Sequence, residues 1–371
     1  MEFHPDILKY IAQYITNDTD RYYFMMTSKS MLKLNLTFNE EYEYDKIMMS
    51  PLYHQFTNIQ IGETLKCMNK YFMGQYLLTL PKNVQRLSIG YFDGLIKKSM
   101  IPTTVTHLIF DPNIYNFAMR CIPPSVKYLT IACSYINFII PMSVTHIILN
   151  NYNDHFHDHI PSSVTDLEII GYFLPINNKI PSSVTNVKIS CTWNDKIFKC
   201  MTDSVTHLSL SYTTDDDFTV PSSITHLIFT DGFNVRIINK LPSFITHLTF
   251  ENIFNKAIDN GIIPSSVTHL TFGHYFNTVI QKSIPSSVTH LKFGEKFNQS
   301  IIHTIPESVI YLTFGKKFNR SLLYLPSSIT HLTLGKLFKQ KLLIPPSVKY
   351  LYLNRNYKGN IPSNVNVYYD D

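Results

Sequence analysis

Histidine residues recur at one fixed place in this sequence, directly after a threonine and before an aliphatic residue. Imidazole can bind metal ions, transfer protons, or change charge between pH 5 and 8. A zinc site needs ligands that converge on one tetrahedral point, whereas repeated residues spread along a line. We therefore expect a polar surface row and no metal or other cofactor. The histidines in this position are His107, His146, His207, His226, His247, His269, His290 and His331.

Other polar residues replace histidine at the same position in five further repeats, namely Tyr128, Asp166, Asn186, Tyr311 and Tyr350. A mixed polar and aromatic row is typical of an interaction surface, and metal binding is the weaker alternative. The residues expected to face a partner are His207, His226, His247, His269, His290, Tyr311 and His331.

A second histidine cluster, His155, His157 and His159, lies between Asp154 and Asp158. In an extended segment these three side chains would share one side, so metal binding is conceivable. A solvated loop is the simpler interpretation.

Lysine gathers toward the end of the chain. Residues 281–360 contain twelve Lys or Arg and two acidic residues, so this segment carries +10 and the remainder −5 of the total net charge of +5. Lys296, Lys316, Lys317 and Lys336 follow the same motif in successive repeats and should line one ridge. Such a ridge attracts acidic protein, nucleic acid or phosphate-rich surfaces, unless it is only a solvated rim.

No enzyme motif accompanies these residues. The sequence lacks a phosphate-binding G-x-x-x-x-G-K-[ST], a G-x-G-x-x-G after a strand, H-E-x-x-H and G-x-S-x-G. Catalysis needs unique groups at one point, which repeated positions do not supply. We expect no catalytic residue and a protein that is not an enzyme.

A repeat of roughly twenty residues positions all of these side chains. The phrase I-P-S-S-V-T-H-L-T-F-G-x-x-F-N stands almost intact at Ile263 to Asn277 and at Ile284 to Asn298. Fourteen prolines and Thr202 mark fifteen repeats. These anchors are Pro81, Pro102, Pro123, Pro141, Pro161, Pro181, Thr202, Pro221, Pro242, Pro264, Pro285, Pro306, Pro326, Pro345 and Pro362.

Each repeat predicts one short strand. Leu291 and Phe293 are two residues apart and point inward, so His290 and Lys292 point outward. The rest of each repeat is too short for a helix of several turns, which favours an extended or 3₁₀ return. We therefore predict a mainly β fold: a parallel solenoid of about 15 short coils with strands on the concave side, preceded by a small α-helical N-terminal segment. Recurring Asn and Ser-Ser residues should satisfy turn backbones.

The F-N followed by I-P and Ser-Ser-[Val/Ile]-Thr-His-Leu resembles the FNIP repeat over residues 81–371. That family is similar to leucine-rich repeats and is known chiefly from social amoebae and giant viruses of amoebae. The sequence from Leu325 to Leu334 also resembles the short leucine-rich repeats of bacterial effectors. Both resemblances imply partner binding rather than catalysis.

The N-terminal residues have a helical period instead. Pro-Asp-Ile-Leu, an Asp-containing turn at Asn17 to Asp20, and Thr-Ser-Lys-Ser resemble an F-box, which docks on the Skp adaptor of a cullin ubiquitin ligase. The resemblance implies that Pro5, Ile7, Leu8, Ile11 and Ile15 contact the adaptor. His4 stands where many F-boxes have Leu, and a common Trp is missing. The alternative is a plain helical cap for the first coil.

These patterns predict an F-box-like helical segment over residues 1–45, a linker with a divergent first coil over residues 46–80, and the FNIP-repeat solenoid over residues 81–371. The divergent coil is indicated by Phe56, Ile59 and Ile61.

Composition sets the remaining expectations. Hydrophobic residues make up 44% and charged residues 16%, which is enough for a buried core. Five cysteines without CxxC spacing indicate reduced thiols. No apolar run approaches the roughly 20 residues that span a bilayer. We expect a soluble monomer of the cytoplasm, the host cytoplasm for a viral protein, that does not bind membranes.

The resemblances together imply a substrate-recruiting adaptor of a cullin-type ubiquitin ligase, with a Skp-type adaptor and a ubiquitination target as protein partners. A scaffold without a ubiquitin link is one alternative. A binder of nucleic acid or phosphate surfaces through the lysine ridge is the other and the less favoured one.

Overall fold

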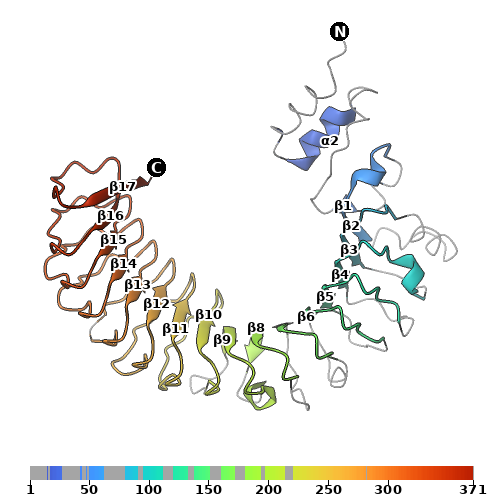
Figure 1. Ribbon diagram of the computed structural model, residues 1–371, viewed down its shortest axis with the longest axis horizontal. Helices are drawn as coiled ribbons and strands as arrows, with labels where there is room; N and C mark the ends of the chain where they lie inside the picture. Colours follow the sequence, from blue (N-terminus) through green and yellow to red (C-terminus); the bar gives the residue numbers. More distant parts are fainter. Residues whose placement is uncertain are drawn as a thin grey trace, which may run out of the picture. The chain divides into compact units, whose positions relative to one another are not determined.

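A computed structural model describes residues 15, 17–26, 42–43, 47, 50–61, 80–90, 95–111, 120–132, 138–150, 160–171, 180–193, 197–213, 220–280 and 282–370. The chain forms two compact units, Met1–Leu167 and Glu168–Asp371 (Figure 1). Of the predicted adaptor-binding residues, Ile15 is half-buried, whereas Pro5, Ile7, Leu8 and Ile11 lie outside the described residues.

The first unit begins with a short helix and continues as parallel strands. Helix α2 (Asp18–Met26) includes the residues that the sequence predicts as an Asp-containing turn. Its start is fixed by the Asn17 side chain, whose Oδ1 accepts a hydrogen bond from the Asp20 N–H at 2.7 Å. Met25 of this helix is buried. The predicted turn is therefore wrong, because Asp18 to Asp20 form the first turn of a helix that Asn17 caps.

The strands of the first unit pair in chain order, each parallel to the next. They are β1 (Tyr42–Glu43), β2 (Asn58–Ile61), β3 (Arg86–Ile89), β4 (His107–Phe110), β5 (Tyr128–Ile131) and β6 (His146–Asn150). The boundary between the units falls inside β7 (Asp166–Ile170). Short 3₁₀ turns at Tyr53–Gln55 and Lys98–Met100 belong to the segments between strands.

The second unit repeats the same parallel pairing coil after coil (Figure 1). Its strands are β8 (Asn186–Trp193), β9 (His207–Thr213), β10 (His226–Phe229), β11 (His247–Phe250), β12 (His269–Phe272), β13 (His290–Lys292), β14 (Tyr311–Thr313), β15 (His331–Thr333), β16 (Tyr350–Asn354) and β17 (Asn366–Asp370). A 3₁₀ turn at Ile197–Cys200 precedes β9. Every one of the fifteen predicted anchors is thus followed by a strand, which confirms the predicted solenoid.

Burial alternates along each strand as the sequence predicts. In β11, Leu248 and Phe250 are buried, while His247 and Thr249 are half-buried on the outward face. A strand exposes successive side chains on opposite faces, so one face of every coil supplies the core. The core of the second unit is therefore a continuous file of Leu, Ile, Val and Phe.

In the second unit, the distance between equivalent rings of neighbouring coils increases from the outward face of the strands toward the core. The outward rings of His247 and His269 are 4.2 Å apart. The inward rings of Phe250 and Phe272 are 5.6 Å apart, and Phe254 and Phe276, farther from the strands, are 6.1 Å apart. Since parallel strands repeat about every 4.8 Å, the outward face must be concave. The stacked phenylalanines thus hold neighbouring coils farther apart on the side away from the strands, so the strands lie on the concave side.

Side-chain ladders hold the turns of neighbouring coils together. The Asn277 N–H donates to Asn255 Oδ1 at 2.8 Å, Asn298 donates to Asn277 at 2.8 Å, and Asn319 donates to Asn298 at 3.0 Å. The second serine of Ser-Ser also bridges coils, as when Ser287 Oγ donates to the Val267 carbonyl at 2.7 Å. These contacts confirm the predicted role of Asn and Ser in these coils, whereas the equivalent hydroxyls of Ser125, Ser143, Ser183 and Ser347 are buried without a hydrogen-bond partner.

Among the described residues, no helix is both long and apolar enough to cross a membrane. Cys121 and Cys200 are buried, and neither takes part in a disulfide bond.

Candidate interaction surface

A continuous stack of rings follows the first position of the strands in the second unit. Successive ring centroids are 4.1 to 4.5 Å apart and the planes are inclined by 26° or less. We call this stack the aromatic row. Its members are His207, His226, His247, His269, His290, Tyr311, His331 and Tyr350. The structure thus brings every sequence-predicted partner-facing residue into one line.

The threonine before each histidine holds the ring in place. Thr246 Oγ1 is 2.9 Å from His247 Nδ1 and 3.2 Å from the Thr225 carbonyl oxygen of the preceding coil. When the hydroxyl gives its single proton to that carbonyl, Nδ1–H must donate to the hydroxyl. Nδ1 is occupied within the protein in either tautomer. Nε2 is therefore the ring nitrogen left to meet a partner.

Burial keeps several rings of this row neutral at pH 7. Desolvation lowers the pKa of His226, His247 and His290, and the neighbouring histidines lower it further. A charge on one ring is disfavoured by charge on the next ring because both sit in the same partly buried stack. The aromatic row is accordingly a flat, weakly charged surface at neutral pH.

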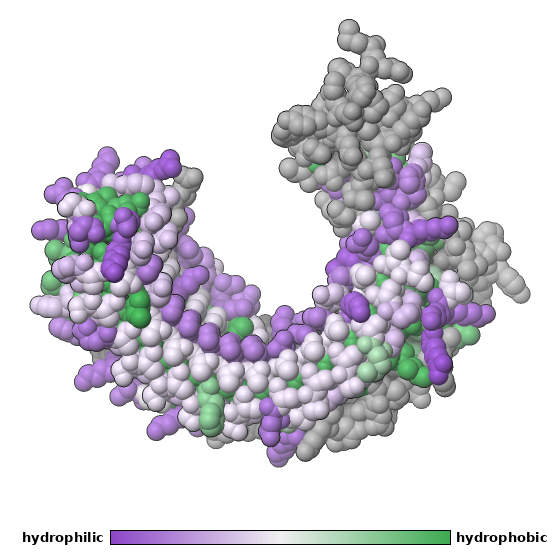
Figure 2. Space-filling view, viewed as in Figure 1, coloured by the Kyte–Doolittle hydropathy of each residue, from purple (hydrophilic) through white to green (hydrophobic). Residues whose placement is uncertain are grey.

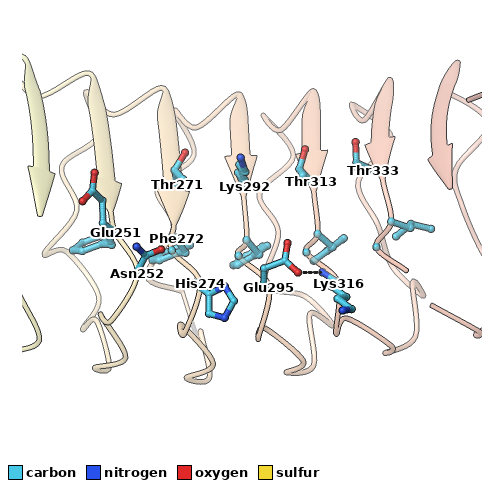
Figure 3. Close-up of a pocket in the computed structure, with 18 of the residues that line it drawn as sticks. Glu251, Asn252, Thr271, Phe272, His274, Lys292, Glu295, Thr313, Lys316 and Thr333 are labelled. Atoms are coloured by element: carbon cyan, nitrogen blue, oxygen red, sulfur yellow. Dashed lines mark hydrogen bonds between the residues drawn. The ribbon is translucent and has the colours of Figure 1, made fainter. Parts of the chain in front are cut away.

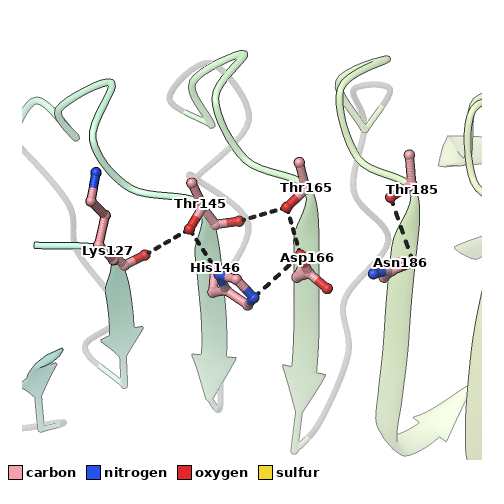
Figure 4. A network of polar contacts seen from close by, with 7 residues as sticks. All are labelled: Lys127, Thr145, His146, Thr165, Asp166, Thr185 and Asn186. Carbon is pink, nitrogen blue, oxygen red and sulfur yellow. Dashed lines mark hydrogen bonds and ion pairs between the residues drawn. The ribbon is translucent and has the colours of Figure 1, made fainter. Parts of the chain in front are cut away.

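The first unit carries a shorter row of the same kind. The rings of His107 and Tyr128 stack at 4.2 Å. His146 lies between Thr145, whose Oγ1 is 2.8 Å from Nδ1, and Asp166, whose Oδ2 is 3.3 Å from Nε2 (Figure 4). Burial, Arg86 and His146 lower the pKa of His107.

Nothing in the described part of the chain gathers three or more His, Cys, Asp or Glu side chains into a metal site. The stacked rings are nearly parallel, so their nitrogens do not converge. His155, His157 and His159 lie outside the described residues.

The four predicted ridge lysines occupy two neighbouring rows instead of one. The four coils of β12 to β15 continue with Gly-x-x-Phe, and Lys316 and Lys336 take the first x, whereas Lys296 and Lys317 take the second. The backbone confirms this alignment, since the Lys317 N–H donates to the Glu295 carbonyl at 2.9 Å. The single ridge that the sequence predicts is therefore split because the motif has two variable positions, each with its own row.

A groove runs along the carboxyl ends of strands β11 to β15 (Figure 3). Its volume is about 600 Å³. One wall is the third strand position, Thr249, Thr271, Lys292, Thr313 and Thr333, and the other is the first x row, Asn252, His274, Glu295, Lys316 and Lys336. Between the walls stand four glycines in successive coils: Gly273, Gly294, Gly315 and Gly335.

These glycines are required by the close approach of the coils. A Cβ on Gly294 would lie 2.0 Å from the Gly273 carbonyl oxygen, and one on Gly315 would lie 2.4 Å from the Gly294 carbonyl. No real Cβ tolerates such contacts, so the strip stays free of side chains. The glycine that follows an inward-facing Phe or Leu in four successive repeats is the sequence signal for this groove.

The family model described as FNIP Repeat matches residues 77–112 and overlapping segments from 233 to 356. The resemblance predicted from the sequence is confirmed for these segments. A comparison with curated protein sequences finds no match.

Solved structures place this fold among leucine-rich-repeat solenoids. A structure described as CroV588, a novel circular LRR protein, is 29% identical with a TM-score of 0.54, over 77% of this chain and 49% of that protein. The present chain thus spans about half the length of CroV588. A TLR13–ssRNA13 complex is 11% identical (TM-score 0.40; 81% and 55% covered), and YopM from Yersinia enterocolitica WA-314 is 13% identical (TM-score 0.30; 78% and 88% covered).

The class that the fold defines is a parallel solenoid of the leucine-rich-repeat type, in which residues 77–112 and 233–356 match the FNIP Repeat model. Such solenoids generally serve as scaffolds for protein binding.

Proposed function

We propose that this chain is a protein-binding scaffold that uses the concave face of its second unit. The aromatic row is the observation that carries this proposal. It offers aligned, stacked rings, most of them half-buried, and aromatic residues with hydrogen-bonding tips are enriched at protein interfaces. Hydrophilic side chains gather along the inner side of the strands of this unit (Figure 2).

Photo-crosslinking tests where the partner binds. A photoreactive phenylalanine analogue replaces Tyr311 of the aromatic row in one protein and Tyr324 in another. Both tyrosines are exposed, at 39% and 59%, but Tyr324 lies on the return segment after its strand. In cells that naturally contain this protein, Tyr311 should give a defined protein adduct that Tyr324 does not. Equal labelling from both positions, or none from Tyr311, would contradict the proposal.

We propose further that the N-terminal segment links this scaffold to a cullin-type ubiquitin ligase in the cytoplasm. The F-box-like pattern of residues 1–45 supports this role, while α2 begins inside the segment that this pattern treats as a turn. In this arrangement the N-terminal helices bind a Skp adaptor, while the concave face binds the ubiquitination target.

Co-purification with a Skp adaptor tests the ligase link. Wild type should bind the adaptor stoichiometrically, and an Ile7→Asp, Ile11→Asp variant of unchanged melting temperature should not. No binding by a folded wild type would leave the N-terminal segment as a cap, and the chain as a scaffold without a ubiquitin link.

A further inference from the structure

The glycine-floored groove described above has the length of a short extended peptide. Side chains close its floor at both ends, since Glu251 precedes the four glycines and Asn354 follows them at the same position of the coil. Five coil steps of about 4.8 Å separate these two ends, which makes about 24 Å. An extended chain rises about 3.3 Å per residue, so about seven residues fill the groove.

Charge is ordered along this length. The carboxylate of Glu251 stands at the β11 end, and desolvation and then the Asp231 carboxylate raise its pKa, a sign that a cationic partner would stabilise its charged form. Three amines follow toward the other end, Lys292 in β13, then Lys316 after β14 and Lys336 after β15. None of these three lysines forms an ion pair within the described part of the chain.

Glu295 lies between Lys292 and Lys316 along the groove, but its single negative charge does not reverse the order of charges. Glu295 Oε2 accepts a hydrogen bond from the Lys316 N–H at 3.3 Å, so it is partly engaged by the neighbouring coil. The groove thus has one acidic end and one basic end. A ligand held along it must present the opposite sequence of charges.

We infer that this groove binds one extended peptide segment of about seven residues, with a basic side chain over Glu251 and acidic side chains over Lys292, Lys316 and Lys336. The inference rests on the proposed scaffold function and specifies part of its partner. Small or polar residues occupy the stretch above the glycines, where no side chain of the protein intervenes.

The lining favours a peptide over single-stranded nucleic acid. The phenylalanines at the groove are buried, which leaves the imidazole of His274 as the one accessible aromatic ring of its lining, whereas binding of successive bases uses several such rings. A phosphate backbone would also place negative charge against Glu251. A peptide satisfies both ends at once because its charges can differ from residue to residue.

Fluorescence anisotropy with synthetic peptides tests this inference on the full chain. The probes are seven-residue peptides with one lysine, three serines and three glutamates in that order, and the reversed peptide. The control peptide has the same composition with the lysine between the glutamates. One of the two ordered peptides should bind at least about tenfold tighter than the control, and equal affinities would overturn the inference.

Matched charge reversals locate the binding site. Lys316→Glu with Lys336→Glu should weaken binding at least about tenfold. Lys317→Glu with Lys339→Glu changes the same net charge in the same two coils outside the groove lining, and should stay within about threefold. Equal losses would reveal general charge attraction and overturn the inference.

Two further results separate the alternatives. Glu251→Gln should weaken the lysine peptide but not a peptide with norleucine in place of lysine. If a ten-nucleotide DNA single strand displaces the labelled peptide at a lower concentration than the unlabelled peptide needs, the groove would instead be assigned to nucleic acid. If Tyr311 crosslinks a protein while no ordered peptide binds, the groove inference fails alone; if neither occurs, the scaffold proposal fails with it.

Discussion

At the residue scale, the four glycines of the groove allow the backbones of neighbouring coils to approach closely. A Cβ at position 315 would stand 2.4 Å from the carbonyl carbon and oxygen of Gly294. Relief of that overlap requires the two coils to move apart, although backbone hydrogen bonds join them on either side. The same lack of a side chain opens the groove, so one residue type meets a structural need and creates a binding surface.

Gly315→Ala should therefore destabilise the protein. Overpacking of this kind costs on the order of 1–3 kcal/mol in the free energy of unfolding. Urea denaturation of the variant measures the loss, with Lys317→Ala as the control because its side chain is exposed in the same turn. The control should change stability by less than about 0.5 kcal/mol. Equal stability of Gly315→Ala and wild type would show that the coils are not in contact at this strip.

The histidines of the aromatic row make stability depend on pH. The pKa values of His226, His247 and His290 lie below the ordinary 6.5 in the folded chain, first through desolvation and then through His207, His269 and His331 beside them. The unfolded chain then binds more protons below about pH 6.5, so stability should fall as the pH drops from 7.5 to 5.5. Carboxylates ordinarily titrate below this window.

Replacement of these three histidines by tyrosine should remove part of this pH dependence. Tyrosine already occupies the row at Tyr311 and Tyr350, where it stacks on His331 at 4.3 and 4.5 Å, so the fold accepts it. The measurement is the urea midpoint of both proteins at pH 7.5 and 5.5. A triple variant that loses as much stability on acidification as wild type would contradict the role given to the row.

At the scale of elements, each coil is fastened to the next by repeated side-chain acceptors. Asn298 Oδ1 accepts from the Asn319 N–H at 3.0 Å in a partly buried turn. Asn298→Ala leaves that N–H without its acceptor, which costs about 1 kcal/mol or more. The Asn319 amide should then exchange hydrogen faster by NMR, while the Asn277 amide, bonded to Asn255, should not change. Unchanged exchange at Asn319 would show that the ladder contributes nothing there.

Most of these elements could be predicted from the sequence because their causes are local and repeated. The Val-x-x-Leu-x-Phe period defines each strand, and the proline anchors each turn. The conformation of the return segments is harder to predict from the sequence, since Lys282, His303 and Tyr324 adopt positive φ although they are not glycines. A left-handed residue other than glycine depends on the turn that holds it, and its own side chain gives no signal.

The candidate site was only partly predictable for a similar reason. Outward strand positions follow from alternation, so the aromatic row could be foreseen. The ring spacing of about 4.2 Å is closer than the strand spacing because the concave face converges, and this curvature arises from phenylalanines on the opposite side. The groove exists because four glycines have no side chain to fill the space between its two walls, and those walls are built by residues of five coils. Neither feature belongs to a single repeat.

At the scale of the whole molecule, charge distinguishes the proposed scaffold from a binder of nucleic acid. The net charge is +5, with the excess of lysine and arginine in residues 281–360. Within the groove, Glu251 and Glu295 stand among these amines, which limits binding to a polyanion. The chain should therefore leave a heparin column below physiological salt. Retention well above that, with a steep loss as salt rises, would favour the nucleic-acid alternative.

The central claim is that the concave face of the second unit binds a protein partner. The most direct test is the affinity of the partner captured through Tyr311, measured by isothermal titration calorimetry. A Tyr311→Ala, His331→Ala variant should lose at least about tenfold in affinity, whereas Leu323→Ala, Tyr324→Ala, which alters exposed residues of the return segment, should stay within about twofold. Equal affinities for the wild type and the row variant, with both folded, would contradict the claim.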